Sequence, residues 1–155
     1  MSYEKKVTAA VVIINRDGDI LGCHGTGKPK DSGFDFPKGL VEPGETDVQA
    51  AIRELLEETG QYAIEDDLID CGVHPHNKEK DIHIFVCPQR YIIPWACKCT
   101  SFFELNGKQY PEIDRFEIIT KKNRNMFNRV LQNKFDIIDE CNEKYKEQHP
   151  ETKDI

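Results

Sequence analysis

Three glutamates with the spacing of a metal site stand in the stretch GLVEPGETDVQAAIRELLEETGQ, which runs from Gly39 to Gln61. On a helix, Glu54, Glu57 and Glu58 would be neighbours, because side chains three and four residues apart meet and like charges there repel each other. We therefore expect a bound cation to offset the repulsion between these carboxylates. Carboxylate oxygens are hard ligands that suit Mg²⁺ or Mn²⁺, and these ions keep several waters and bridge to the phosphate oxygens of a substrate.

Other residues of the same stretch can support the carboxylates. Arg53 precedes Glu57 by four residues and can brace it, while Glu45 can in turn hold Arg53. Gly39 and Gly44 permit tight backbone turns, which can bring a carbonyl oxygen close to a metal. A Glu-rich helix taken alone is more often a solvated acidic face. The metal hypothesis therefore depends on a longer pattern.

The stretch also carries the signals of the helix that must position these side chains. Apolar residues recur at three- and four-residue spacing, as on a helix packed against a sheet: Val48, Ala51, Ile52 and Leu55. Thr46 followed by Gln49 fits a capping box, and Gly60 stands where a left-handed residue commonly ends a helix. We predict a helix over residues 46–59, with the three carboxylates on the face opposite the apolar stripe.

The segments on either side of this helix predict a sheet. Strands are expected at residues 7–15, 19–25, 62–76, 81–89 and 112–119, the first two as a hairpin around the Asp17-Gly18 turn. An Asn-Gly turn is expected within residues 101–110, before the strand at residues 112–119. Residues 25–33 predict a loop, and the chain from residue 121 onward predicts one or two closing helices.

Length and composition limit the classes of protein that this sequence can encode. The 155 residues, 38% of them hydrophobic, suit one core, so we expect one domain over residues 1–147 and a solvated tail over residues 148–155. No apolar run of about 18 residues predicts a membrane span, and no export signal is evident, so we expect a cytoplasmic protein with reduced thiols. A net charge of −7 argues against a surface that coats DNA or RNA.

A longer pattern joins these residues. Seven positions follow the spacing GX5EX7REUXEEXGU: Gly39, Glu45, Arg53, Glu54, Glu57, Glu58 and Gly60. This pattern resembles the signature of the Nudix hydrolases, and chance would produce it at a given start with a probability on the order of 10⁻⁹–10⁻⁸. The resemblance implies an α/β protein with the Nudix fold, an α/β/α sandwich around a mixed β-sheet. Gln61 departs from the pattern, because the family has a bulky aliphatic residue there.

The resemblance also implies a reaction. Nudix hydrolases cleave a nucleoside diphosphate linked to another group, through attack of a metal-activated water on phosphorus. By the family pattern, Mg²⁺ or Mn²⁺ would be held by Glu54, Glu57, Glu58 and the carbonyl of Gly39. The general base stands either on this helix or in a later loop, so Glu57 and Glu112 are both candidates.

The residues just before the signature suggest a substrate. The sequence GFDFPKG resembles the dinucleoside polyphosphate hydrolases and some RNA 5′-end pyrophosphohydrolases of the family. Lys38 would then contact the bridging phosphates, with help from Lys28 and Lys30. A dinucleoside polyphosphate is the leading hypothesis. The alternatives are a pyrophosphohydrolase or decapping-type enzyme acting on RNA 5′ ends, guided by basic residues 121–125 and Arg129, and a sensor that binds a nucleotide without cleaving it.

A nucleotide substrate also needs a surface on which its base can stack. Five aromatic residues are available for this role: Phe34, Phe36, Tyr91, Trp95 and Phe116. Most aromatic side chains in a domain of this size belong to the core, so none of the five is assigned.

Overall fold

Strand β1 (Lys6–Ile14) forms the centre of the computed structural model, which describes residues 5–89 and 91–150. Its side chains alternate between two hydrophobic cores. Ala10, Val12 and Ile14 belong to one core, and Ala9, Val11 and Ile13 to the other. A strand that is buried on both faces explains why this segment is an uninterrupted apolar run.

The strands beside β1 make the sheet mixed. β6 (Lys80–Pro88) pairs in parallel with β1 along its whole length, and β5 (Ile69–Pro75) pairs antiparallel with β6. On the other side of β1 lies the short strand β4 (Lys38–Leu40), which is antiparallel to it. This pairing places Gly39 opposite Ala9, at the centre of the sheet.

The turn of the predicted opening hairpin is present, but its two strands pair at one position only. β2 (Ile20–Gly25) meets β1 only where Ile14 lies opposite Ile20. It then leaves β1 and runs between β3 (Phe34–Asp35) and β9 (Ile113–Ile119), both antiparallel to it. The predicted loop connects β2 to β3.

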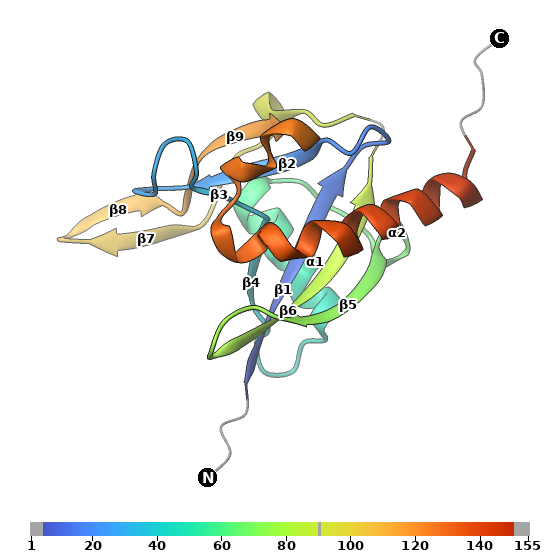
Figure 1. Ribbon diagram of the computed structural model, residues 1–155. Coiled ribbons are helices and arrows are strands. Elements are labelled where there is room, and N and C mark those ends of the chain that lie inside the picture. Colours follow the sequence, from blue (N-terminus) through green and yellow to red (C-terminus); the bar gives the residue numbers. More distant parts are fainter. Residues whose placement is uncertain (1–4, 90, 151–155) are drawn as a thin grey trace.

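Two helices cover the two faces of the sheet (Figure 1). α1 (Asp47–Thr59) packs on the core that contains Val11, and α2 (Phe135–Gln148) packs on the core that contains Val12. This arrangement is the predicted α/β/α sandwich. Within the described residues, no helix is long and apolar enough to span a membrane.

The described residues also contain four short 3₁₀ segments. They are η1 (Glu65–Asp67), η2 (Pro94–Ala96), η3 (Lys121–Met126) and η4 (Arg129–Lys134). The strand predicted at residues 62–76 is therefore wrong in its first half, and the closing region contains one α-helix preceded by two 3₁₀ segments. α2 continues through Gln148, the first residue of the predicted tail; residues 151–155 lie outside the described residues.

A second, two-stranded sheet projects from the body of the molecule (Figure 1). Strands β7 (Phe102–Leu105) and β8 (Lys108–Pro111) pair antiparallel. Their turn contains Asn106 and Gly107 with φ values of 53° and 81°. Two consecutive positive φ values are what a two-residue hairpin requires, and Asn-Gly accepts them. The predicted Asn-Gly turn is confirmed, and the structure shows that it joins two paired strands.

Candidate functional site

A pocket of about 700 Å³ lies where β4 meets α1. Its wall is formed by β4 and the loop that follows it, the start of β1, the acidic face of α1, and the connection between β8 and β9. The predicted site residues that line it are Lys38, Gly39, Glu54, Glu57 and Glu112. Residues more than 70 positions apart in the sequence therefore meet in one cavity.

Helix α1 presents its glutamates to this pocket because both of its ends are fixed. Thr46 and Gln49 form the predicted capping box, and Gly60 ends the helix with φ 74°. At the last turn, Thr100 donates its N–H and its hydroxyl to the carbonyl of Glu57, at 2.7 and 3.0 Å. These bonds satisfy a carbonyl that a helix end leaves unpaired.

The three glutamates are neighbours on α1, but they differ in exposure. Glu54 and Glu57 line the pocket, but Glu58 is only 6% exposed and lies at the edge of the buried stripe, beside Ala51 and Leu55. Its Oε1 accepts a long hydrogen bond from the backbone N–H of Lys38, at 3.3 Å. Glu58 therefore borders the apolar stripe and is not among the residues that line the pocket, because its angle on the helix is close to that of Ala51.

Arg53 organises the carboxylates around it. Its Nε and Nη2 donate to both oxygens of Glu45, at 3.0 and 2.7 Å, and Nη2 also donates to the carbonyl of Leu40, at 3.1 Å. Nη1 donates to Glu54 at 2.8 Å and to Glu57 at 3.4 Å. The support predicted for Glu45 and Arg53 is thus present as a network that ties the loop after β4 to the helix.

Gly39 is required for a steric reason that the sequence did not reveal. A Cβ atom at this position would overlap the carboxyl group of Glu54. The absence of a side chain on β4 therefore gives Glu54 its space in the pocket, and it also exposes the backbone at the place where the family pattern puts a metal-binding carbonyl.

The three candidate lysines have different environments. Lys38 lines the pocket, and its ammonium forms an ion pair with Asp35 at 3.1 Å. Burial by itself lowers the pKa of Lys38, but the charge and hydrogen bond of Asp35 outweigh it and raise the pKa. Lys28 and Lys30 are exposed on the loop between β2 and β3 and are not among the pocket residues. The sequence therefore missed Asp35, which holds Lys38, and the substrate contacts of Lys28 and Lys30 stay predictions for residues outside the pocket lining.

The later carboxylate predicted as a base does reach the pocket. Glu112 lies where β8 passes into β9, and its Oε2 accepts a hydrogen bond from the hydroxyl of Ser101, at 3.3 Å. Its backbone carbonyl accepts from the N–H of Thr26, at 3.0 Å. These contacts hold Glu112 across the cavity from α1.

The electrostatics of the cluster favour a cation. Burial raises the pKa of Glu54, and the charges of Glu57 and Glu112 raise it further against the opposing effect of Arg53. Burial and the charge of Glu54 raise the pKa of Glu58 to about 8. Both carboxyl groups are therefore reluctant to ionise together, and a divalent ion would remove that cost.

The donor set therefore fits Mg²⁺ or Mn²⁺ in type and charge. Among the described residues, no three acidic, cysteine or histidine side chains already converge as a metal cage. The physical reason is visible in the contacts of Arg53, which engages Glu54 and Glu57 itself. A metal at this site has to compete with Arg53 for these two carboxylates.

The remaining departure from the signature has a local explanation. Gln61 is half-buried, and its amide donates to the thiol sulfur of Cys97, at 3.1 Å, while its backbone N–H donates to the hydroxyl of Thr59, at 3.0 Å. A polar side chain thus replaces the expected aliphatic contact at the helix exit. The pocket residues are unaffected.

A second pocket of about 680 Å³ lies beside the C-terminal half of α2. It is lined by acidic residues of η1, such as Asp66, and by Lys144 and Tyr145. None of the signature residues reaches it, so we assign the chemistry to the pocket at β4 and α1.

Comparison with known proteins identifies the family of the chain. The family model for the NUDIX domain matches residues 4–120, which include every residue of the pocket. The chain belongs to the Nudix family.

Curated Nudix relatives match over a short region. The RNA pyrophosphohydrolase of Erythrobacter litoralis (strain HTCC2594) is 38% identical over 55 residues, which are 36% of this chain and 34% of that protein. The RNA pyrophosphohydrolase of Yersinia enterocolitica (serotype O:8, biotype 1B) is 44% identical over 50 residues, 32% of this chain and 27% of that protein. The chain thus spans about a third of the length of these relatives.

Solved Nudix structures match over most of the chain. The NUDIX domain of Shewanella oneidensis NrtR, complexed with ADP ribose, has a TM-score of 0.64 at 13% identity and covers 92% of this chain and 89% of that one. MutT from Methanosarcina mazei Go1 has a TM-score of 0.61 at 20% identity and covers 92% and 98%. Identities this low establish the Nudix fold and leave the substrate to chemical argument.

Proposed function

We propose that this Nudix protein is a divalent-metal-dependent pyrophosphohydrolase that cleaves a phosphoric anhydride in a nucleotide. The observation that carries the proposal is that Glu54, Glu57 and Glu112 line one pocket, with the buried Glu58 next to Glu54 on the same helix. Carboxylates placed this close together are unfavourable without a cation. The metal, Mg²⁺ or Mn²⁺, would supply a bound water of lowered pKa and neutralise the diphosphate.

The chain's own residues supply position and proton transfer. Glu54, Glu57, Glu58 and the carbonyl of Gly39 would hold the ion. Glu112 lines the same cavity as Glu54 and Glu57, and this supports it as the base that accepts the proton of the attacking water, with Glu57 as the alternative base. Arg53 and Glu45 keep the acidic face of α1 fixed through the bonds described above. A fixed carboxylate needs no reorganisation during the reaction.

Lys38 supports a substrate with several linked phosphates. Its ammonium lies at the pocket wall, where it can bind a phosphate oxygen as a point charge. Asp35 already balances that charge, so Lys38 would exchange one anionic partner for another when substrate binds. Together with the resemblance of GFDFPKG, this position favours a dinucleoside polyphosphate as the substrate.

RNA 5′ ends are the second candidate substrate. The relatives that match the signature region are named RNA pyrophosphohydrolases, at 38% and 44% identity over about a third of their length. A 5′-triphosphorylated RNA offers the same phosphoric anhydride as a nucleotide. The two candidates therefore share the site and differ in what lies beyond the phosphates.

Replacing Glu57 by Gln tests the proposed reaction. The change removes a pocket carboxylate but keeps its size, so we expect kcat to fall by about 10²-fold or more while the melting temperature is maintained. The assay is product analysis with Mg²⁺ or Mn²⁺ on diadenosine polyphosphates, ADP-ribose, nucleotide sugars, nucleoside triphosphates and triphosphorylated RNA. Glu79→Gln, in an exposed turn, is the control.

Either of two results would reject the proposal. One is a Glu57→Gln variant that retains near-normal turnover with Mg²⁺. The other is an unmodified protein that binds nucleotides tightly and cleaves none of the panel, which would identify it as a nucleotide sensor.

A further inference from the structure

The β7–β8 hairpin forms a sheet of its own that projects from the body of the molecule (Figure 1), and Glu112, the residue after β8, lines the pocket. None of its described side chains belongs to the three hydrophobic clusters of the molecule. A two-stranded hairpin is only marginally stable in water without such packing. Apolar side chains on this hairpin are therefore not explained by the core.

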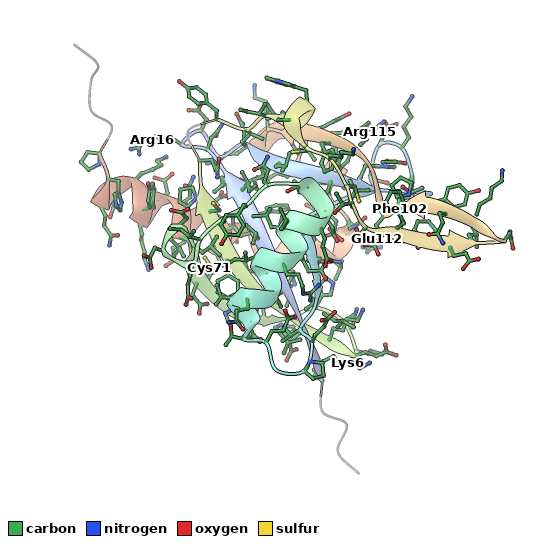
Figure 2. The ribbon with its side chains drawn as sticks, turned by 180° about the vertical axis from the view of Figure 1, so that it is seen from behind. Lys6, Arg16, Cys71, Phe102, Glu112 and Arg115 are labelled. Atoms are coloured by element: carbon green, nitrogen blue, oxygen red, sulfur yellow. The ribbon has the colours of Figure 1, made fainter. Side chains whose placement is uncertain are left out.

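One face of the hairpin is continuous with the wall of the pocket. Side chains on a strand alternate between faces, and the register pairs Phe103 with Tyr110. The residues that share this face are Ser101, Phe103 and Leu105 on one strand and Lys108, Tyr110 and Glu112 on the other. The bond from the Ser101 hydroxyl to Glu112 is consistent with this assignment. Figure 2 shows Glu112 at the base of the hairpin, where it leaves the body of the molecule.

The face therefore presents three kinds of group in order. Glu112 stands at the pocket. Phe103 and Tyr110 follow, their half-buried rings stacked with centroids 5.7 Å apart and planes at 28°. Tyr110 is two residues from Glu112, which is about 7 Å along a strand and within the reach of one nucleoside. The exposed Lys108 stands beyond the rings and adds a positive charge for a phosphate.

We propose that Phe103 and Tyr110 form the surface on which the nucleobase of the substrate stacks while its phosphates occupy the pocket. The inference rests on the proposed function and adds the subsite that selects nucleotides over bare polyphosphates. Aromatic stacking accepts every base, so this subsite favours a nucleotide without choosing its sequence.

Phe102 provides a matched control on the same hairpin. It is the neighbour of Phe103 in sequence, it is 55% exposed, and alternation turns it to the opposite face, opposite Pro111. Any effect of a substitution on hairpin stability should be similar at the two positions. Any effect on base stacking should appear at Phe103 alone.

Binding is measured first, because it does not depend on turnover. The only tryptophan of the chain is changed, Trp95→Phe, and a reporter is introduced by Phe103→Trp or, in the control, by Phe102→Trp. We expect ADP with Mg²⁺ to quench the fluorescence of the Phe103→Trp protein, and inorganic pyrophosphate to leave it unchanged. The Phe102→Trp protein should not respond to ADP. Adding Tyr110→Leu should weaken ADP binding by about 10- to 100-fold.

Kinetics provide the second readout. The double variant Phe103→Leu with Tyr110→Leu should raise KM for the best nucleotide substrate by about 10-fold or more with little change in kcat, whereas Phe102→Leu should leave both near their original values. Thermal melting of all variants shows whether the fold persists. When Phe103→Tyr is used in place of Phe103→Leu, the KM should return toward its original value, because tyrosine keeps an aromatic ring at this position.

The outcomes separate this inference from the proposed function. Equal responses of the two tryptophan reporters, or an unchanged KM in the double variant of an active enzyme, would overturn the stacking surface alone. ADP-dependent quenching confined to Phe103→Trp, in a protein that hydrolyses none of the substrates, would support the stacking surface and reject the hydrolase.

Discussion

At the scale of single residues, neighbouring glutamates of one helix acquire different properties from their surroundings. Glu57 is partly exposed at the pocket, whereas Glu58 is buried and its pKa rises to about 8. Glu45 has its pKa lowered, chiefly by the hydrogen bonds from Arg53. Chemically identical glutamates thus differ in exposure and in pKa because of burial and because of hydrogen bonds from one arginine.

Gly39→Ala tests the steric role of the glycine. The added methyl group would overlap the carboxyl group of Glu54, so we expect Glu54 to be displaced and the protein to lose about 1–3 kcal/mol of unfolding free energy. The affinity for Mn²⁺ and the hydrolytic rate should both fall. Gly25→Ala is the control, because its Cβ would meet only the flexible side chain of Lys28. A Gly39→Ala protein with unchanged Mn²⁺ affinity would contradict the assignment.

Lys38→Ala tests the phosphate contact. Removing the ammonium should raise KM for polyphosphate substrates about 10-fold, because charge-assisted hydrogen bonds to phosphate contribute about 1.5–3 kcal/mol. Lys28→Ala is the matched control, since the structure places Lys28 outside the pocket. Steady-state kinetics on a diadenosine polyphosphate provide the measurement. Equal KM values for the two variants would remove Lys38 from the substrate site.

At the scale of elements, the start of α1 is tied to the sheet by an ionic cluster. His83 of β6 lies between Asp47 of α1 and Asp70 of β5, with both of its ring nitrogens 2.7 Å from a carboxylate oxygen. Burial alone would lower the pKa of His83, but the hydrogen bonds and charges of the two aspartates raise it above its ordinary value. The helix that carries the glutamates is therefore tied to two strands through the imidazole of His83.

This cluster predicts a pH-dependent stability. Because the pKa of His83 is higher in the folded protein, its contribution is complete below the ordinary pKa of histidine and is lost as the pH rises through the folded pKa. Compared with His83→Gln, the unmodified protein should be more stable by about 1–2 kcal/mol near pH 5.5, after allowance for the exposure of Asp70, and the difference should shrink toward pH 9. Urea unfolding at several pH values measures it. A constant difference across this range would show that His83 is not charged in the fold.

At the scale of the whole molecule, a basic segment proposed to guide RNA is partly structural. Arg124 donates to both oxygens of Asp139, at 2.6 and 2.7 Å, and its guanidinium lies over the ring of Phe135, 4.8 Å from the centroid. It also donates to the carbonyl of Gly18, at 3.1 Å. Arg124 thus joins η3 to α2 and to the turn after β1. The segment therefore offers RNA fewer positive charges than its sequence suggests.

Arg124→Ala should therefore affect stability rather than RNA. We expect a loss of about 2–3 kcal/mol of unfolding free energy, since charged hydrogen bonds in a partly buried site are removed. The dependence of kcat/KM on salt, measured with triphosphorylated RNA, should not change. Lys122→Ala, which alters an exposed lysine of the same segment, should leave stability unchanged. A shallower salt dependence in the Arg124 variant would return this residue to an RNA surface.

Prediction from sequence succeeded where the signals are local. The helix over residues 46–59, its capping box and its C-terminal glycine agree with the structure, because capping and periodicity act within a few residues. The turn predicted at Asn106-Gly107 also agrees with the structure, because it depends on two adjacent residues. The predicted strand over residues 62–76 was wrong in its first half, where a 3₁₀ turn lies at Glu65–Asp67. The start of the strand is set by its pairing with β6, which begins at Ile69 and which the local sequence does not reveal.

The family, the helix and the identity of the clustered carboxylates were determined by the sequence alone, because a fixed spacing on a regular helix fixes which side chains are neighbours. Only the tertiary structure decided that Glu58 is buried, that the side chain of Asp35 pairs with Lys38, and that Lys28 and Lys30 are not among the pocket residues. It also brought Glu112 into the same pocket as Glu54 and Glu57. Glu112 is more than 50 residues from these glutamates, and strand pairing and core packing, which no local pattern encodes, bring the segments together.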